Sequence, residues 1–401
     1  MKKLLVLGAG FLQSFLIKKS RELGYYTIAL DKDNEAVGFK YANEFAVIDI
    51  VDQEQCLEFA RLNNIDGVIT AATDYGVLTA AYIAKELMLP GLDYEVAKLI
   101  KNKFLVRKKI SNQNADHMEN FFIIEQNTNL NELTRQIKYP MIIKPVDGSG
   151  SKGVHKISSY NDLQSYSTEA ISFSKQKLAY LEEFIEGKEY GVESVVYNGI
   201  IYVLCIMNKD MTEPPIYAEL GHSVPSDLEN ESLVVDVVKK TIKTLGINFG
   251  AVNMDVLIKD NNVFVIDIGA RMGGNLIGSH IVPLHTGFDY MEYLIKTSLN
   301  EDVSKMFPES NDINKAVSTR ILALKPGIIK DTIDFEELEK EFNVKIFFNK
   351  SIGDKIYPYI NNLDGCGYII CVSSNKQNAY DISSKVKSII DDQIIREKDF
   401  L

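Results

Sequence analysis

The stretch of sequence that decides the fold is AVNMDVLIKDNNVFVIDIGARMGGN, residues 251–275. Two apolar runs, residues 251–258 and 263–268, flank a short polar turn at residues 259–262. This arrangement predicts an antiparallel hairpin, in which residues of the two strands can share one face of a sheet.

Three charged residues make this hairpin a candidate reaction site. Asp255 lies on the first strand, and Asp267 interrupts the apolar second strand, where an ionised carboxylate is unfavourable unless a cation or hydrogen bonds compensate it. Arg271 follows in the glycine-flanked segment 269–275, which suits close approach of a substrate. Carboxylates, magnesium and an arginine are typical of phosphoryl transfer. The alternative is a pair of aspartates on a solvated sheet face.

A second candidate site lies upstream, where Lys144 closes a predicted strand at residues 141–145. It precedes the glycine-rich loop DGSGSKG, residues 147–153. The free N–H groups of such a loop can fold over a triphosphate. The loop is not a Walker loop, because no Gly-Lys-Ser/Thr opens a helix, and a glycine-rich turn without a ligand is the alternative.

A third candidate site is the acidic run EEFIEGKE, residues 182–189, in which a predicted strand at 180–184 ends in glutamates and a glycine. In a nucleotide site, the backbone of residues 183–185 would bind the adenine edge and a later carboxylate would bind the ribose hydroxyls. A solvated acidic turn is the alternative.

The N-terminal residues predict an open parallel sheet. Strands are expected at residues 3–7, 26–30 and 67–70, and helices at 11–23, 53–62 and 75–88. The turn Gly8-Ala9-Gly10 would suit a dinucleotide, but Gln13 occupies the position of the third glycine and crowds the pyrophosphate. A tight turn that holds part of a substrate is therefore preferred to an NAD site.

The residues after the parallel sheet predict an α+β fold rather than a doubly wound one. A helix rich in basic residues is expected at 101–110, a hairpin at 191–206 turning at Asn198-Gly199, and a small C-terminal unit with strands near 317–324 and 368–373 and a helix at 378–390.

The composition limits the classes of binding partner and the cellular compartment that are expected. The chain has 401 residues, 46% of them hydrophobic, and a formal net charge of -11, which disfavours nucleic acid and anionic membranes. Its four cysteines have no zinc-ligand spacing and fit a reducing compartment. The opening MKKLLVLGAG lacks a cleavage site, and no apolar run reaches the roughly twenty residues of a membrane helix. A cytoplasmic, soluble protein is expected.

In this order and spacing, the basic helix, Lys144 with its glycine-rich loop, EEFIEG, and the acidic hairpin with Arg271 resemble the ATP-grasp superfamily over essentially the whole chain. The resemblance implies a Rossmann-like pre-ATP-grasp domain at residues 1–98, a two-lobed ATP-grasp domain at 99–310 with its lid at about 120–180, and a small α+β C-terminal domain at 311–401.

The resemblance also implies roles for individual residues. Lys103 and Lys144 resemble the pair that binds the α- and β-phosphates, Asp255 and Asp267 the magnesium ligands, and Arg271 the arginine that steadies the transferring phosphoryl group. Lys144 and Arg271 are the predicted catalytic residues. The remaining predicted ATP contacts are in the loop, the linker and the ribose position: Gly148, Ser149, Gly150, Ser151, Gly153, Glu182, Glu183, Phe184, Ile185 and Glu189.

The chain departs from the family where Gly269 replaces the usual Asn two residues after the second acid, which leaves one metal ligand in doubt; Asn275 or water could replace it. ATP and Mg²⁺ are the expected cofactors, with Mn²⁺ as an alternative. The candidate substrate contacts are Gly8, Gly10, Gln13, Asn275 and His280; for His280 and His285, a core or capping role is the alternative.

The implied reaction joins a carboxylate to an amine through an acyl phosphate, with ADP and phosphate as products. The segment GARMGGN and the small C-terminal unit favour amino-acid ligases, followed by purine-pathway members such as phosphoribosylglycinamide synthetase, which would use phosphoribosylamine and glycine. The carboxyaminoimidazole enzyme and the carbamoyl-phosphate synthase large chain share the outline. An NAD-dependent oxidoreductase and a non-catalytic nucleotide-binding protein remain as other classes. Small-molecule partners are expected, and a homodimer is common among such enzymes.

Overall fold

The computed structural model describes residues 1–148, 150, 152–307 and 315–397. Its N-terminal part contains a four-stranded parallel sheet in the order β3-β2-β1-β4, which confirms the predicted open sheet. The strands are β1 (Lys3–Leu7), β2 (Tyr26–Asp31), β3 (Glu44–Val47) and β4 (Gly67–Thr70), and the helices are α1 (Phe11–Glu22), η1 (Phe39–Tyr41), α2 (Gln53–Asn63) and α3 (Val77–Glu86).

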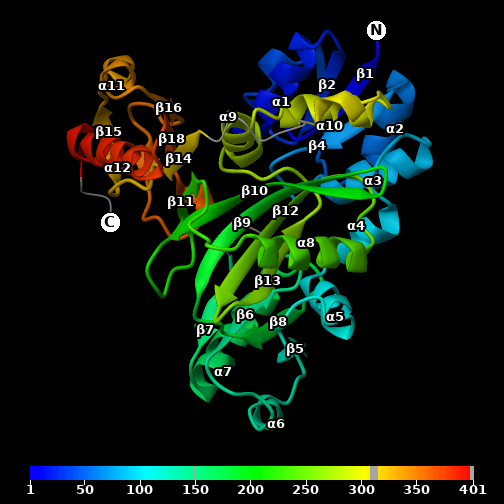
Figure 1. The fold of residues 1–401 in the computed structure, drawn as a ribbon, viewed down its shortest axis with the longest axis vertical. Helices are drawn as coiled ribbons and strands as arrows, with labels where there is room; N and C mark the ends of the chain where they lie inside the picture. The colour runs from blue at the N-terminus through cyan, green and yellow to red at the C-terminus, as the bar shows by residue number, and fades with distance from the viewer. Residues whose placement is uncertain (149, 151, 308–314, 398–401) are drawn as a thin grey trace.

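An antiparallel eight-stranded sheet forms the centre of the molecule, in the order β13-β12-β9-β10-β11-β14-β18-β16 (Figure 1). The sheet runs across residue 310, so strands on both sides of this predicted domain boundary pair directly; the domain division itself stays a prediction. The strands are β9 (Lys188–Tyr197), β10 (Ile200–Met211), β11 (Glu219–Val224), β12 (Gly250–Lys259), β13 (Asn262–Gly269), β14 (Ala316–Ile321), β16 (Val344–Phe348) and β18 (Gly367–Ser373).

The two predicted hairpins of this sheet are confirmed. The turn between β9 and β10 places Asn198 and Gly199 at φ 49° and 76°, and the turn between β12 and β13 places Asp260 and Asn261 at φ 50° and 62°. Positive φ at both central residues matches the right-handed twist of the flanking strands, and Asn, Asp and Gly tolerate it best.

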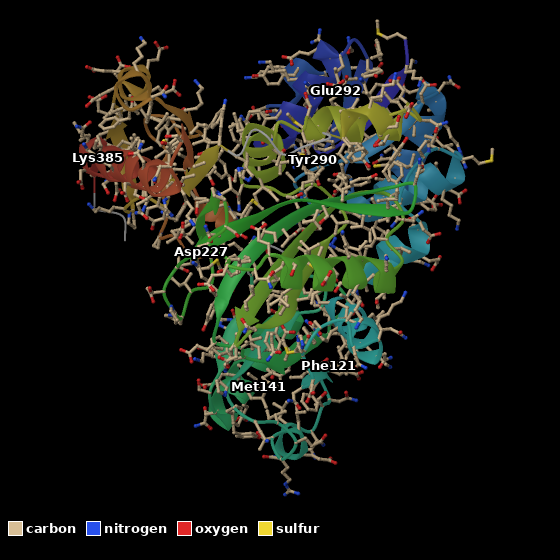
Figure 2. All side chains as sticks on the ribbon, viewed as in Figure 1. Phe121, Met141, Asp227, Tyr290, Glu292 and Lys385 are labelled. Atoms are coloured by element: carbon tan, nitrogen blue, oxygen red, sulfur yellow. The ribbon has the colours of Figure 1, made fainter. Side chains whose placement is uncertain are left out.

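A separate four-stranded sheet, β5-β8-β6-β7, forms the lobe at the bottom of Figure 1. Phe121 of β5 and Met141 of β6 mark this lobe in Figure 2. Its elements are β5 (Phe121–Ile124), α6 (Leu130–Leu133), β6 (Met141–Pro145), β7 (His155–Ile157), α7 (Tyr160–Phe173) and β8 (Ala179–Glu183).

Helices cover the central sheet because they present one apolar face. On α8 (Ser232–Leu245), the buried residues Val234, Val238 and Leu245 recur at helical spacing, and the helix ends at Gly246 with φ 81°. The other helices are α4 (Tyr94–Ile100), α5 (Lys103–Asn112), η2 (Ile277–Ile281), α9 (Val282–Thr286), α10 (Tyr290–Ser298), η3 (Ser304–Met306), α11 (Phe335–Phe342), η4 (Asn362–Asp364) and α12 (Lys376–Gln393).

The C-terminal part adds a three-stranded sheet, β17-β15-β19, formed by β15 (Gly327–Asp331), β17 (Lys355–Ile356) and β19 (Ile395–Glu397). The largest hydrophobic cluster joins the parallel sheet to the central one, with Leu4, Val195, Tyr290 and Val317 among its members. All four cysteines are reduced and buried. Among the described residues, no helix combines the length and the apolar character needed to cross a membrane.

Candidate functional site

The two aspartates of the predicted hairpin lie directly opposite each other, Asp255 on β12 and Asp267 on β13. Opposed residues of an antiparallel pair project from the same face, so two like charges repel unless they are compensated. Lys103, the first residue of α5, binds the Asp267 carboxylate, and Lys209 of β10 lies 2.9 Å from Asp255 Oδ2. Two lysines from separate elements therefore stabilise the pair.

The electrostatic environments of the two aspartates differ. Burial raises the pKa of Asp255 to about 6; neighbouring carboxylates add to this rise, and a lysine opposes it. Burial also raises the pKa of Asp267, but the ammonium groups of Lys103 and Lys144 outweigh it, so this pKa lies below its ordinary value. Asp267 is thus the more firmly ionised of the two.

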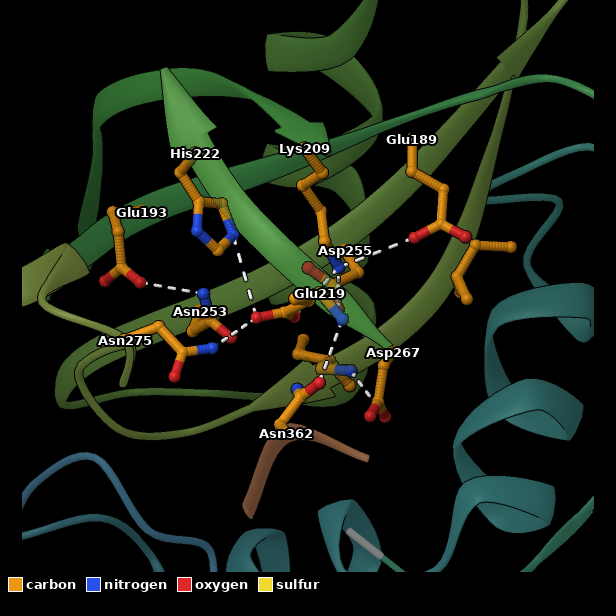
Figure 3. A network of polar contacts seen from close by, with 12 residues as sticks. Glu189, Glu193, Lys209, Glu219, His222, Asn253, Asp255, Asp267, Asn275 and Asn362 are labelled. Atoms are coloured by element: carbon orange, nitrogen blue, oxygen red, sulfur yellow. Dashed lines mark hydrogen bonds and ion pairs between the residues drawn. The ribbon is translucent and has the colours of Figure 1, made fainter. Parts of the chain in front are cut away.

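Lys209 carries a buried charge into the middle of an acidic cluster (Figure 3). Its side chain is 2% exposed, and Nζ lies 3.2 Å from Glu219 Oε1 and 3.4 Å from Glu189 Oε2, in addition to the contact with Asp255. One ammonium group thus faces three carboxylates. The excess negative charge suits a divalent cation, which prefers oxygen ligands.

The donor set at the hairpin fits magnesium. Within the described parts of the chain, no three His, Cys, Asp or Glu side chains form a ready-made metal cluster. Mg²⁺ is nevertheless commonly held by one or two carboxylates together with phosphate oxygens of the substrate. Asp255 and Asp267 can supply that share.

A cavity of about 480 Å³ lies between the β5–β8 lobe and the central sheet. Ile142 of β6 and Leu257 and Ile266 of β12 and β13 give it apolar walls, which suit a planar base. The structure brings most of the predicted ATP-binding residues to this cavity: Lys103, Lys144, Gly148, Gly150, Glu182, Glu183, Phe184, Ile185 and Glu189, together with Asp255 and Asp267.

Lys144 and Glu182 form a buried ion pair at the floor of this cavity. The Lys144 ammonium also donates to the Ile266 carbonyl at 3.1 Å. The Glu182 side chain is 2% exposed, and both the Tyr180 hydroxyl and Arg107 approach it as well. Lys144 is thus held in place before any phosphate binds.

Two of the predicted loop residues, Ser149 and Ser151, lie outside the described residues. Gly153 does not line the cavity; it has φ 70°, and a Cβ there would lie 2.8 Å from the Phe173 ring. The structure therefore gives Gly153 a packing reason to be glycine.

A second cavity, of about 290 Å³, adjoins the first. The two share six lining residues: Lys103, Gly148, Gly150, Glu219, Asp255 and Asp267. The second cavity extends between the loop after β4, the glycine-flanked segment after β13 and the C-terminal part of the chain. Residues that line the second cavity but not the first include Leu12, Asp74, Arg271, Asn275, Asn362 and Tyr368.

Arg271 is held by protein acceptors in the second cavity. Its Nε and Nη2 donate to Asp74 Oδ1 and Oδ2 at 2.9 and 3.1 Å, and Nη1 donates to Asn253 Oδ1 at 3.0 Å. Asn253 in turn donates to Glu193 at 2.8 Å (Figure 3). Tyr290, marked in Figure 2, donates its hydroxyl to the other Glu193 oxygen at 2.8 Å.

Glu193 is fully buried behind this arginine. Burial raises its pKa to about 8, and the hydrogen bonds from Tyr290 and Asn253 oppose the rise. A network of polar residues therefore extends from the core of the central sheet to the Arg271 guanidinium.

Some predicted substrate residues lie away from both cavities. Gln13 is 8% exposed and donates to the Ala71 carbonyl, and its side chain covers Gly8 and Gly10, which fills the approach that a dinucleotide would need. His280 packs against the rings of Phe15 and Phe347, and burial lowers its pKa to about 4.

The remaining predicted residues have different surroundings. Asn275 lines the second cavity, donates to Glu219 and accepts from the Tyr368 hydroxyl at 3.1 Å. His285 is buried outside both cavities and contacts the Lys315 carbonyl.

Five residues of the site were not predicted: Asp74, Glu193, Lys209, Glu219 and Asn253. Glu193 interrupts an apolar strand, as Asp267 does, and the reasoning applied to Asp267 would have identified it. Lys209 lies in the polar run Asn208-Lys209-Asp210 at the end of β10 and carries no such signal. Asp74 and Arg271 are 197 residues apart, and no local pattern indicates their contact.

The chain resembles known proteins in sequence and in fold. Residues 100–275 match the model of the ATP-grasp domain. The crystal structure of an L-amino acid ligase from Bacillus licheniformis has a TM-score of 0.85 and 22% identity over 99% of both chains. That of phosphoribosylglycinamide synthetase from Anaerococcus prevotii has a TM-score of 0.77 and 26% identity over 99% of this chain and 100% of that one. Human carnosine synthase 1 is 23% identical over 71% of this chain, which spans 38% of the human protein.

Proposed function

We propose that this chain joins the carboxylate of an amino acid to an amine through an acyl phosphate. It is an ATP-dependent, C–N bond-forming ligase built on an ATP-grasp domain, with ATP and Mg²⁺ as cofactors. The observation that carries the proposal is the wall shared by the two cavities. Lys103, Asp255 and Asp267 line both, so a phosphate from one side and a carboxylate from the other can meet there.

The first step transfers the γ-phosphoryl group. Lys103 and Lys144 bind phosphate oxygens as point charges. Asp255 and Asp267 would hold Mg²⁺, which would neutralise negative charge on the phosphates. A carboxylate oxygen attacks the γ-phosphorus, the bond to ADP breaks, and an acyl phosphate forms. Arg271 stabilises the negative charge that spreads over the transferring group.

The second step forms the C–N bond. An amine in the second cavity attacks the acyl carbon, loses a proton and expels phosphate. The glycine-rich loop from Asp147 to Gly153 contributes Gly148 and Gly150 to both cavities. Closure of this loop would exclude water and protect the acyl phosphate from hydrolysis.

The second cavity offers groups that can bind both ends of an amino acid. Three cationic side chains line it and can bind a carboxylate: Lys101, Lys103 and Arg271. Five carboxylates also line it: Asp74, Asp147, Glu219, Asp255 and Asp267. With Asp255 and Asp267 assigned to Mg²⁺, Asp147 and Glu219 can accept hydrogen bonds from an ammonium group. Phosphoribosylamine with glycine is the second candidate pair, supported by the likeness to phosphoribosylglycinamide synthetase.

A screen of phosphate and ADP release tests the proposal. The purified protein is supplied with MgATP and pairs of amino acids, with glycine plus phosphoribosylamine, or with bicarbonate. We expect release only with amino-acid pairs, together with a ligated product detected by mass spectrometry. Release with phosphoribosylamine and glycine alone would replace the substrate assignment. Binding of MgATP without turnover on any pair would favour a non-catalytic nucleotide-binding protein.

A further inference from the structure

The loop after β4 is docked onto the segment that carries Arg271. Ala72 has φ 55°, uncommon for a residue with a side chain, and its N–H donates to the Met272 carbonyl at 3.1 Å. This hydrogen bond joins the parallel sheet's loop to the residue that follows Arg271. The backbone is thus arranged to bring the next loop residues to the guanidinium.

Asp74 uses both carboxylate oxygens on Arg271. The two parallel bonds, at 2.9 and 3.1 Å, fix the plane of the guanidinium as well as its position. The third bond, from Arg271 Nη1 to Asn253 Oδ1, connects the guanidinium to the buried Glu193. A guanidinium has five N–H donors, so these three bonds leave two for a substrate.

Gly269 is explained by the same ion pair. A Cβ at this position would lie 2.9 Å from Asp74 Oδ1 and 3.2 Å from Arg271 Cζ. Glycine at position 269 therefore makes room for the Asp74 carboxylate. In the sequence alone, the same glycine appeared as the loss of a metal ligand.

The position of the pair at the second cavity indicates a role beyond folding. The side chains of Arg271 and Asp74 are 15% and 31% exposed, and both line the second cavity. Bidentate geometry at the mouth of a site is better explained by the orientation it imposes.

We propose that Asp74 is a positioning residue that orients the Arg271 guanidinium for phosphoryl and acyl transfer, and that Gly269 is glycine to admit it. The inference rests on the proposed ligase function. It gives the N-terminal parallel sheet a part in positioning Arg271, because the loop after β4 supplies the carboxylate. Asp74 acts through Arg271, so its loss should lower kcat and leave nucleotide binding intact.

The first test compares Asp74→Ala and Asp74→Asn with Glu58→Gln, which removes one carboxylate from the exposed face of α2. We expect Asp74→Ala to lower kcat about 100-fold, because a misplaced catalytic group has effects of that order. The KM for ATP should stay within about twofold. Asp74→Asn, which keeps one acceptor, should be intermediate, and Glu58→Gln should match the wild type. Unchanged kcat in Asp74→Ala would overturn the inference, as would equal losses in kcat and ATP affinity.

The second test uses Gly269→Ala, which leaves Asp74 itself unchanged. This variant tests the same contact if Asp74→Ala does not fold. Its added methyl group displaces the Asp74 carboxylate, so kcat should again fall about 100-fold. In the double variant with Asp74→Ala, the methyl group meets no carboxylate, and the further loss should be less than about threefold. If the losses of kcat in the two single variants multiply in the double variant, the proposed contact between Gly269 and Asp74 is contradicted.

If the wild type itself ligates no substrate pair, the proposed function fails. The role of the bidentate contact is then tested by whether Asp74→Ala weakens phosphate binding to the MgADP complex.

Discussion

Asp255 and Asp267 lie opposite each other on paired strands, and each carboxylate is bound by a lysine from a different element. These ion pairs compensate the like charges of the two aspartates. A Mg²⁺ ion held at the hairpin would supply part of the same compensation and leave Lys103 available to phosphate oxygens. Lys103 and Asp267 are therefore expected to exchange partners when MgATP binds.

Asp267→Asn should reduce ADP formation by at least about 100-fold, because it removes a proposed anionic ligand of Mg²⁺ beside the transferring phosphate. Its side chain is 45% exposed, so the fold should persist. A coupled ADP assay and far-UV circular dichroism would measure the two effects.

Asp260→Asn is the matched control for that variant. It makes the same chemical change in the turn of the same hairpin, where φ is 50° and Asn is well tolerated. Its activity should equal that of the wild type. Full activity in Asp267→Asn would remove Asp267 from the metal site.

Arg271→Ala should lower kcat by about 100- to 1,000-fold, the range observed when a donor to developing negative charge is removed. Affinity for ATP should change little, because Arg271 lines the second cavity and not the nucleotide cavity. Calorimetric titration with ATP separates the two effects. Arg135→Ala, an exposed arginine after α6, is the control and should be silent in both measurements.

Lys209→Met should destabilise the metal-free protein by about 3–5 kcal/mol, because it leaves three carboxylates without their buried cation. Millimolar Mg²⁺ should recover part of this loss. Urea denaturation with and without Mg²⁺ would measure both quantities. Lys259→Met, at the exposed end of β12, should show neither effect. A Lys209→Met protein as stable as the wild type would mean that the carboxylates do not repel one another.

Glu193→Gln should change the dependence of stability on pH. The pKa of Glu193 is raised to about 8, so the native protein binds a proton that the unfolded chain has already released. This group's contribution to stability therefore falls as pH rises from about 4.5 to about 8. Gln mimics the protonated state and does not titrate. The melting temperature of the variant minus that of the wild type should increase between pH 5 and pH 8, and a constant difference would contradict the raised pKa.

The sequence predicted the fold well wherever local patterns are strong. The hairpin β12–β13, the strands β1, β4 and β6, and the alternation of the parallel unit are confirmed within a few residues. The strand β3 was missed because its four residues, EFAV, sit at a sheet edge with only alternate residues half-buried. The strand β11 was missed because Gly221 and His222 interrupt its apolar character.

The site was less accessible to sequence reasoning, because its remaining members depend on contacts between distant segments. Asp74, for example, reaches Arg271 across 197 residues. A carboxylate on a surface loop carries no periodic signal. By contrast, Glu193 interrupts an apolar strand and could have been found by the rule that identified Asp267.

The continuity of the central sheet across residue 310 limits how this chain can be recombined with its relatives. β14 pairs with β11 on one side and with β18 on the other, so backbone bonds join the two halves of the sheet. An exchange of the C-terminal segment would transplant three of the eight strands, and the strand registers of donor and recipient would have to agree residue by residue. New specificities are therefore more accessible through the loops that end at the second cavity than through the exchange of whole segments.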